Sequence, residues 1–159
     1  MAGTPIDALD KAILTNLLID GRQSQVDLAE RVPLSPTAIA RRIRAMEEAG
    51  VIEGYQAQVS RKALGLTMMV VVQISLKSQS EDLLAAFEKA ATAAPAVISC
   101  HMMSGEDDYI ITVLARDLAD FERIHKEQLS RLPGVARLRS SFVLREVASR
   151  QLPTSSLSR

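Results

Sequence analysis

Residues 24–50 have the sequence SQVDLAERVPLSPTAIARRIRAMEEAG, and this stretch decides how the N-terminal part of the chain folds. Ser24 is a good N-cap for a short helix, which the dipeptide at 33–34 interrupts because proline removes an amide donor. Ser35 caps a second helix with proline in its first turn, where proline costs least, and Gly50 ends it. A short helix, a tight break and a capped helix are typical of a helix-turn-helix.

Apolar residues at helical spacing define the buried faces of these helices. An earlier helix, capped by Asp7 and stopped at Gly21, completes a three-helix unit. The residues predicted to face inward are Leu9, Ile13, Leu14, Leu17 and Leu18 in the first helix, Val26, Leu28, Ala29 and Val32 in the second, and Ile39, Ile43 and Met46 in the third. A short strand over 51–56 is expected to follow Gly50.

The apolar pattern changes to a period of two after residue 65, which indicates a second module. Strands are predicted over 69–77, 96–103, 109–115 and 135–147, with helices beginning after Ser80 and Asp117. The order strand-helix-strand-strand-helix-strand is that of a ferredoxin-like fold. We therefore predict an α+β chain with a winged helix-turn-helix domain and linker over 1–64 (motif at about 25–44), a ferredoxin-like βαββαβ domain over 65–149, and a flexible tail over 150–159.

Composition and charge exclude several classes of protein. The chain has 19 Lys+Arg and 19 Asp+Glu, so it is not a nonspecific polycation. Aromatic residues are 3%, too few for a platform that stacks single-stranded nucleic acid. The N-terminus lacks the basic and apolar regions of a signal peptide, and no apolar run reaches the roughly 20 residues that span a bilayer. We expect a cytoplasmic protein without a membrane partner.

The positive charge is concentrated on the third predicted helix, since residues 35–46 carry three arginines and no acid. Arginine can make bidentate contacts to guanine or pair with phosphate, and serine and threonine do either more weakly. Three arginines on a helix can equally be a solvated face, and small three-helix units also bind proteins. The residues alone therefore leave DNA binding and protein binding open.

Residues 105–108, Gly-Glu-Asp-Asp, form the most polar turn of the second module. Gly105 would let a ligand approach the backbone, and Asp108 offers an acceptor for an ammonium group. A plain hairpin turn is the favoured interpretation from these residues alone, and one turn seldom supplies enough ligands for a cation. Cys100 and His101 are adjacent on a strand and point to opposite faces. We predict no catalytic residue, no metal site and no cofactor.

Several different short motifs follow one another along nearly the whole chain. They are IDALDKAIL at 6–14, DGR at 20–22, DLA at 27–29, LS at 34–35, RI at 42–43, EEAGVIEGY at 47–55, GEDDY at 105–109 and LPGV at 132–135. In this combination the chain resembles the leucine-responsive regulator/asparagine regulator (Lrp/AsnC, or feast/famine) family. Members often have glycine where this chain has Pro33, so the turn can differ in shape, although we expect the helix pair to survive.

The resemblance implies a sequence-specific transcriptional regulator that binds double-stranded DNA and is not an enzyme. It also implies a C-terminal effector-binding (RAM) domain that forms homodimers through its sheet, assembles to tetramers or octamers, and binds a small effector, usually an amino acid. The implied DNA-binding residues are Ser35, Thr37, Arg41, Arg42 and Arg44, and the implied effector-binding residues are Gly105, Glu106, Asp107, Asp108, Tyr109 and Ser140. Either serine at 140–141 can match the family's threonine, and we assign Ser140. Two alternatives stay open: an enzyme similar to siroheme decarboxylases, and an architectural DNA-binding protein without an effector.

Overall fold

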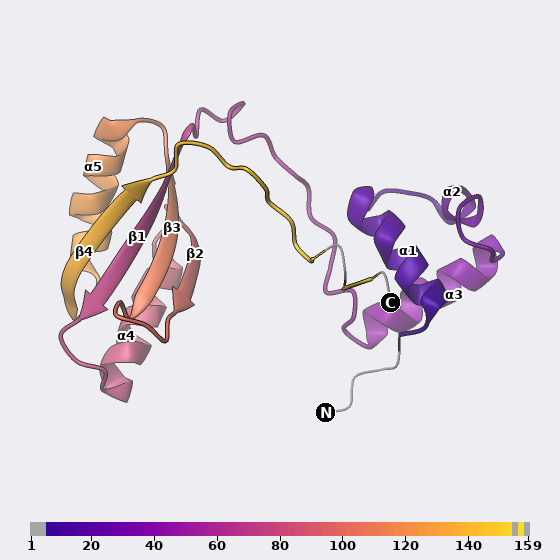
Figure 1. The fold of residues 1–159 in the computed structure, drawn as a ribbon, viewed down its shortest axis with the longest axis horizontal. Helices are drawn as coiled ribbons and strands as arrows, with labels where there is room; N and C mark the ends of the chain where they lie inside the picture. Colours follow the sequence, from indigo (N-terminus) through magenta and orange to yellow (C-terminus); the bar gives the residue numbers. More distant parts are fainter. Residues whose placement is uncertain (1–5, 154–155, 158–159) are drawn as a thin grey trace. The chain divides into compact units, whose positions relative to one another are not determined.

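The chain folds as two compact units (Figure 1). The computed structural model describes residues 6–153 and 156–157. The first unit holds the residues up to Gln58 and those from Ala148 on, and the second spans Val59–Val147. Residues 1–5, on which the signal-peptide expectation rests, and residues 154–155 and 158–159 of the predicted tail lie outside the described residues. No helix in the described part of the chain is long and apolar enough to cross a membrane.

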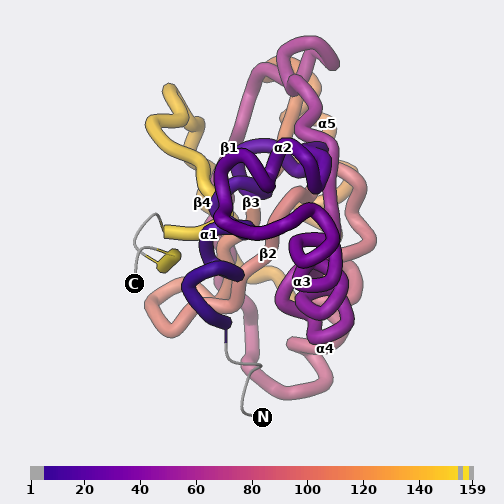
Figure 2. The backbone as a smooth tube through the Cα atoms, turned by 90° about the vertical axis from the view of Figure 1, so that its right-hand side faces the viewer, coloured from indigo at the N-terminus to yellow at the C-terminus, as the bar shows by residue number. Residues whose placement is uncertain are grey.

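The first unit contains the three predicted helices, α1 (Ala8–Ile19), α2 (Gln25–Ala29) and α3 (Pro36–Glu48). Each begins at its predicted cap, because the cap side chain accepts hydrogen bonds from amides of the first turn that have no partner within the helix. The caps are Asp7, Ser24 and Ser35. Figure 2 follows the chain from α2 through the turn into α3. This succession confirms the predicted helix-turn-helix.

The three helices enclose a small apolar core. The buried residues of this core are Ile13, Leu28, Val32, Ile39 and Met46. Two residues predicted to face inward are instead exposed: Val26 (62%) and Leu18 (43%). Successive helix residues are separated by about 100°, so Val26 lies far round the helix from buried Leu28, and Leu18 lies beyond the edge of the buried stripe. The pattern therefore predicted too wide an apolar face.

The predicted strand over 51–56 is wrong, because no strand forms there. Gly50 ends α3 with a φ of 70°. The Gly50 N–H donates to the Glu47 carbonyl (3.0 Å) and the Val51 N–H to the Met46 carbonyl (2.8 Å), the two bonds of a Schellman motif. This turn directs Val51 and Ile52 back onto the helical core, where they are half-buried. The described residues of the first unit therefore lack a β-wing.

The second unit has the predicted ferredoxin-like order. Its elements are β1 (Met68–Leu76), α4 (Glu81–Ala93), β2 (Val97–Met102), β3 (Tyr109–Ala115), α5 (Leu118–Glu127), a 3-10 turn (Leu129–Arg131) and β4 (Val135–Phe142). The antiparallel sheet has the strand order β2-β3-β1-β4. β4 ends short of the predicted residue 147. Its pairing finishes where the Val143 N–H donates to the Met69 carbonyl (2.9 Å), at the start of β1.

The two faces of the sheet differ. Helices α4 and α5 cover one face (Figure 1), where the side chains of Val70, Val72 and Ile74 are fully buried. Alternation along the strands places the intervening side chains on the opposite face, which no helix of the second unit covers. We call this the open sheet face; its members include Val71, Gln73, Ser75, Ile110, Thr112, Leu114, Arg137 and Arg139.

Candidate functional site

The exposed side of α3 carries the cationic residues predicted to contact DNA. Thr37, Arg41 and Arg44 are all exposed and are separated by four and three positions, so they lie on one face of the helix. Ser35 stands at the N-terminal end, where its Oγ accepts from the Ala38 N–H (3.3 Å). Neither Arg41 nor Arg44 forms an ion pair with any described residue. We call Ser35, Thr37, Arg41 and Arg44 the reading face.

Arg42 lies in a different environment. Its Nη1 donates to Asp7 Oδ2 and to Asp10 Oδ1, both at 2.8 Å, and its side chain is 27% exposed. The hydrogen bonds that Arg42 donates to Asp10 and Asp7 raise the pKa of Arg42 above its ordinary value. The structure therefore separates Arg42 from the four residues of the reading face.

The turn between α2 and α3 accommodates Pro33. The Leu34 N–H donates to the Val32 carbonyl at 2.7 Å, a bond that spans Pro33. A turn of this kind needs a central φ near −75°, which the proline ring already supplies. Val32 is buried at its start, and Pro33 itself is exposed. The proline is thus compatible with a compact helix pair, as we expected.

Residues 105–108, which we call the effector turn, connect β2 to β3. The Met103 N–H donates to the Asp108 carbonyl at 2.8 Å and closes the turn. Asp108 fixes it to the end of β1: its Oδ2 accepts from the Leu76 N–H (2.7 Å) and its Oδ1 from Gln79 Nε2 (2.6 Å). Gly105 has open space where a Cβ would stand. The Asp108 carboxylate is therefore already engaged within the chain.

Asp107 is the most buried charged residue of the turn, with 8% of its surface exposed. Its Oδ2 accepts from Arg139 Nη2 (2.8 Å) and its Oδ1 from Ser75 Oγ (3.1 Å). Burial acts to raise the pKa of Asp107, but the hydrogen bonds from Arg139 and Ser75 outweigh it, and the pKa lies below its ordinary value. The carboxylate therefore stays ionised at neutral pH.

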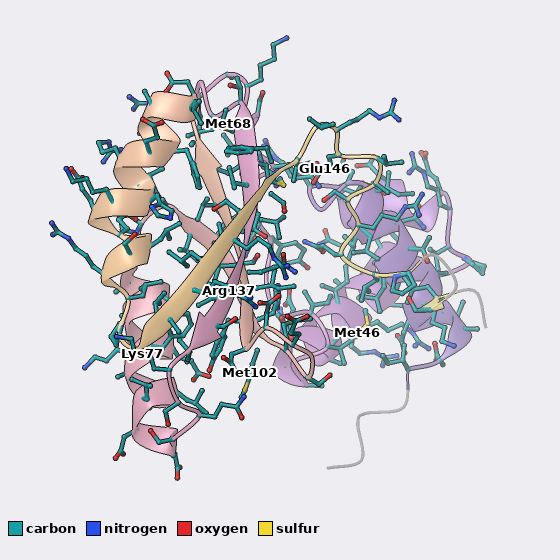
Figure 3. All side chains as sticks on the ribbon, turned by 60° about the vertical axis from the view of Figure 1, so that its left-hand side comes forward. Met46, Met68, Lys77, Met102, Arg137 and Glu146 are labelled. Carbon is teal, nitrogen blue, oxygen red and sulfur yellow. The ribbon has the colours of Figure 1, made fainter. Side chains whose placement is uncertain are left out.

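Arg137 is held more loosely than Arg139. It lies on β4 (Figure 3), and its Nη2 is 3.5 Å from both Glu106 Oε1 and Asp107 Oδ1. The Glu106 side chain is 80% exposed. The structure thus brings Glu106 and Asp107 together with two arginines of the open sheet face. Sequence reasoning missed these arginines, although their spacing of two on a predicted strand placed them on one face.

Tyr109 and Ser140 lie on the other side of the sheet. Tyr109 is paired with Ile74 and Ser140 with Val72, so both side chains share the helix-covered face. The Tyr109 hydroxyl donates to Glu88 Oε1 (2.7 Å), and burial followed by this hydrogen bond raises the pKa of Tyr109 to about 12. The structure therefore does not bring these two residues together with the carboxylates of the effector turn.

Cys100 and His101 point to opposite faces, as predicted: Cys100 pairs with Ile111 on the helix-covered face and His101 with Ile110 on the open sheet face. Burial, and then the charge of Glu88, raise the pKa of the Cys100 thiol. Across the described residues, no three His, Cys, Asp or Glu side chains are grouped to hold a metal ion.

Comparison with known proteins agrees with this architecture. Residues 69–153 match the Lrp/AsnC ligand binding domain, and residues 6–53 match a winged helix-turn-helix DNA-binding domain. The Bkd operon transcriptional regulator of Pseudomonas aeruginosa is 41% identical over 148 residues, which are 93% of this chain and 97% of that protein. The chain belongs to the Lrp/AsnC family.

Two further relatives extend this result. The leucine-responsive regulatory protein of Rhizobium meliloti is 39% identical to this Lrp/AsnC protein over 142 residues, covering 89% of this chain and 91% of the relative. The crystal structure of a transcriptional regulator from Neisseria meningitidis, solved as its L-Met complex, has a TM-score of 0.90 at 32% identity and covers 96% and 99% of the two chains. The protein is a DNA-binding transcriptional regulator with a ligand-binding domain and not an enzyme. The siroheme decarboxylase alternative is therefore set aside.

Proposed function

We propose that this Lrp/AsnC protein is a cytoplasmic regulator that binds operator DNA as a homodimer or larger assembly and responds to a small amino acid. The observation that carries the DNA half is the reading face of α3. It presents two exposed arginines in the middle of α3 that form no ion pair with a described carboxylate, and Ser35 at the N-terminus of the same helix. Free guanidinium groups can read guanine edges or bind phosphates, and the helix N-terminus offers amides to a phosphate.

Ser35, Thr37, Arg41 and Arg44 are proposed to contact DNA. Ser35 uses its oxygen lone pair for the cap, which leaves its hydroxyl proton available to a phosphate oxygen. Arg41 and Arg44 are one helical turn apart and can reach neighbouring base pairs in the major groove. Arg42 is left out of this set because two carboxylates already hold it.

The open sheet face supports the proposed dimer. Val71, Ile110 and Leu114 contribute apolar side chains to this face, and each is only half-buried in the single chain. Apolar side chains on a sheet face are stabilised when another layer buries them. Pairing of two such faces around a two-fold axis would produce a symmetric dimer, and two reading faces would then meet half-sites spaced by whole turns of DNA.

The effector turn supports an amino acid as the ligand class. The relative from Neisseria meningitidis was crystallised with L-Met, and the Rhizobium meliloti relative is named as leucine-responsive. In this chain the turn combines the carboxylates of Glu106 and Asp107 with the loosely held guanidinium of Arg137. A zwitterion needs both kinds of group, a carboxylate for its ammonium and a cation or amide for its own carboxylate. We propose that Gly105 and Glu106 make the primary contacts, that the engaged carboxylates of Asp107 and Asp108 hold the turn in place beside them, and that Tyr109 and Ser140 shape the site from the helix-covered face.

Isothermal titration of the full chain against the twenty amino acids tests the effector proposal. We expect saturable binding of at least one amino acid, with Leu and Met measured first. The Glu106→Gln variant should weaken that binding, whereas Glu122→Gln, which removes an exposed carboxylate on α5, should not. The absence of binding by any amino acid would contradict the proposal and would favour the architectural alternative.

A further inference from the structure

Arg42 occupies the side of α3 that faces α1, away from the reading face. It follows Ile39 by three positions and precedes Met46 by four, and both of these residues are buried in the helical core. Arg42 therefore lies at the edge of the buried stripe, whereas Arg41 and Arg44 are exposed. Its guanidinium is directed at the first turn of α1 and binds both Asp7 and Asp10.

The two aspartates are also the capping box of α1. Asp7 Oδ1 accepts from the N–H groups of Leu9 and Asp10, both at 2.8 Å, and Asp10 Oδ2 accepts from the Asp7 N–H at 3.1 Å. Each carboxylate thus uses one oxygen for the α1 cap and its other oxygen for Arg42. Asp10 is largely buried, with 14% of its side chain exposed, so water competes little for this contact. Charge-assisted hydrogen bonds of this length are among the strongest in proteins.

We propose that Arg42 is a positioning residue, which ties the middle of α3 to the capped start of α1 and so sets the orientation of the reading face. It does not itself contact DNA. The inference rests on the proposed DNA contacts of α3 and assigns to Arg42 a role in operator specificity.

The contacts of Arg42 with Asp7 and Asp10 control operator specificity. Hydrogen bonds to base edges need donor–acceptor distances of about 2.7–3.2 Å and good alignment, so a small rotation of α3 breaks them. Nonspecific binding comes from charge attraction to phosphates and tolerates the same rotation. Loss of the contacts between Arg42 and the two aspartates therefore lowers affinity for the operator far more than affinity for random DNA.

The decisive variant is Asp10→Asn, because the two roles of Arg42 predict opposite changes. If Arg42 contacted DNA, removal of a neighbouring carboxylate would release it and would tighten binding to a polyanion. If Arg42 positions α3, the loss of the carboxylate weakens operator binding. Arg42→Gln removes the other partner and should give the same loss. Asp27→Asn is the matched control, because Asp27 holds the same place in the α2 capping box with Ser24 and has no contact with an arginine of α3.

The experiment uses two duplexes: one selected from a random pool by the wild-type protein, and a scrambled duplex of the same composition. We expect Asp10→Asn and Arg42→Gln each to weaken binding of the selected duplex by about five- to 150-fold, the cost of losing one base-pair readout. Their affinity for the scrambled duplex should change less than about threefold, and Asp27→Asn should change neither affinity by more than about twofold. A simple loss of folded protein would lower both affinities alike and leave their ratio unchanged.

The salt dependence gives a second readout. Each phosphate contact makes log K fall more steeply with log salt, by about 0.9 in slope. Arg42 makes no phosphate contact under this proposal, so Arg42→Gln should leave the slope unchanged. Tighter or unaltered binding of the selected duplex by Asp10→Asn, an equal loss on both duplexes in a variant that circular dichroism shows to be folded, or a shallower salt dependence for Arg42→Gln would each overturn the inference. If the wild type itself does not distinguish the duplexes, the proposed specific function fails and this inference fails with it.

Discussion

A pair of glycine substitutions tests how tightly the second unit is packed at the start of β4. Gly134 and Gly65 both have a φ of 71°, a conformation that favours glycine. A Cβ at Gly134 would stand 2.6 Å from Leu83 Cδ1 and Cδ2, whereas a Cβ at Gly65 would meet nothing within 4 Å. Alanine at either position destabilises the folded backbone by the same amount, about 1–2 kcal/mol, and the lower entropy of the unfolded chain partly offsets this loss. Only Gly134→Ala adds a steric clash.

Overpacking among fixed neighbours costs about 1–3 kcal/mol. Leu83 is half-buried and has room to rotate, so Gly134→Ala should unfold more easily than Gly65→Ala by about 1 kcal/mol, the lower end of that range. For a unit of this size, each kcal/mol lowers the melting temperature by about 4–8 °C. Urea and thermal unfolding followed by circular dichroism measure the difference directly, because the shared backbone contribution cancels between the two variants. Equal stabilities of the two variants would contradict this prediction and would mean that Leu83 moves aside without cost. The position matters for the site because β4 carries Arg137 and Arg139.

Three further predictions concern single side chains. Arg41→Ala and Arg44→Ala should each weaken operator binding by about 1–3 kcal/mol in fluorescence anisotropy, with Arg123→Ala on α5 as an unaffected control; unchanged affinity in both variants would place the reading face elsewhere. Because the pKa of Tyr109 is about 12 in the folded chain and the unfolded chain loses this proton near pH 10, stability should fall as pH rises from 10 to 12. Urea midpoints should therefore fall less steeply with pH in Tyr109→Phe than in the wild type, and parallel curves would contradict this assignment. Since burial raises the pKa of Cys100, its thiol should react with Ellman's reagent at pH 7 much more slowly in the folded than in the urea-unfolded chain, and equal rates would show that it is accessible.

The parts of the fold that depend on local chemistry could be predicted from the sequence. Asp7, Ser24 and Ser35 start their helices because capping involves only the next three residues. The strands of the second unit follow from the period of two, and the order of its elements leaves few topologies. The strand predicted after Gly50 was wrong. Val51 and Ile52 have the β-branched side chains that favour strands, but the Schellman hydrogen bonds to α3 set the direction of the backbone there.

The parts of the site that depend on long-range contacts could not be predicted. The sequence alone groups Arg42 with Arg41 and Arg44, because nothing in it reveals the contacts with Asp7 and Asp10, which lie more than thirty positions away. Arg139 reaches Asp107 only through the register of β4 against β1. The face on which Tyr109 lies follows from the pairing of β3 with β1, which a motif match does not contain.

We propose that this Lrp/AsnC protein recognises a specific DNA sequence and that an amino acid changes its affinity for that sequence. Fluorescence anisotropy at fixed salt should compare a selected operator duplex with a scrambled one, each with and without saturating amino acid. We expect the operator duplex to bind at least about 10³-fold more tightly than the scrambled duplex, and the effector to change operator affinity by about fivefold or more. Equal affinity for the two duplexes, with or without any of the twenty amino acids, would contradict it.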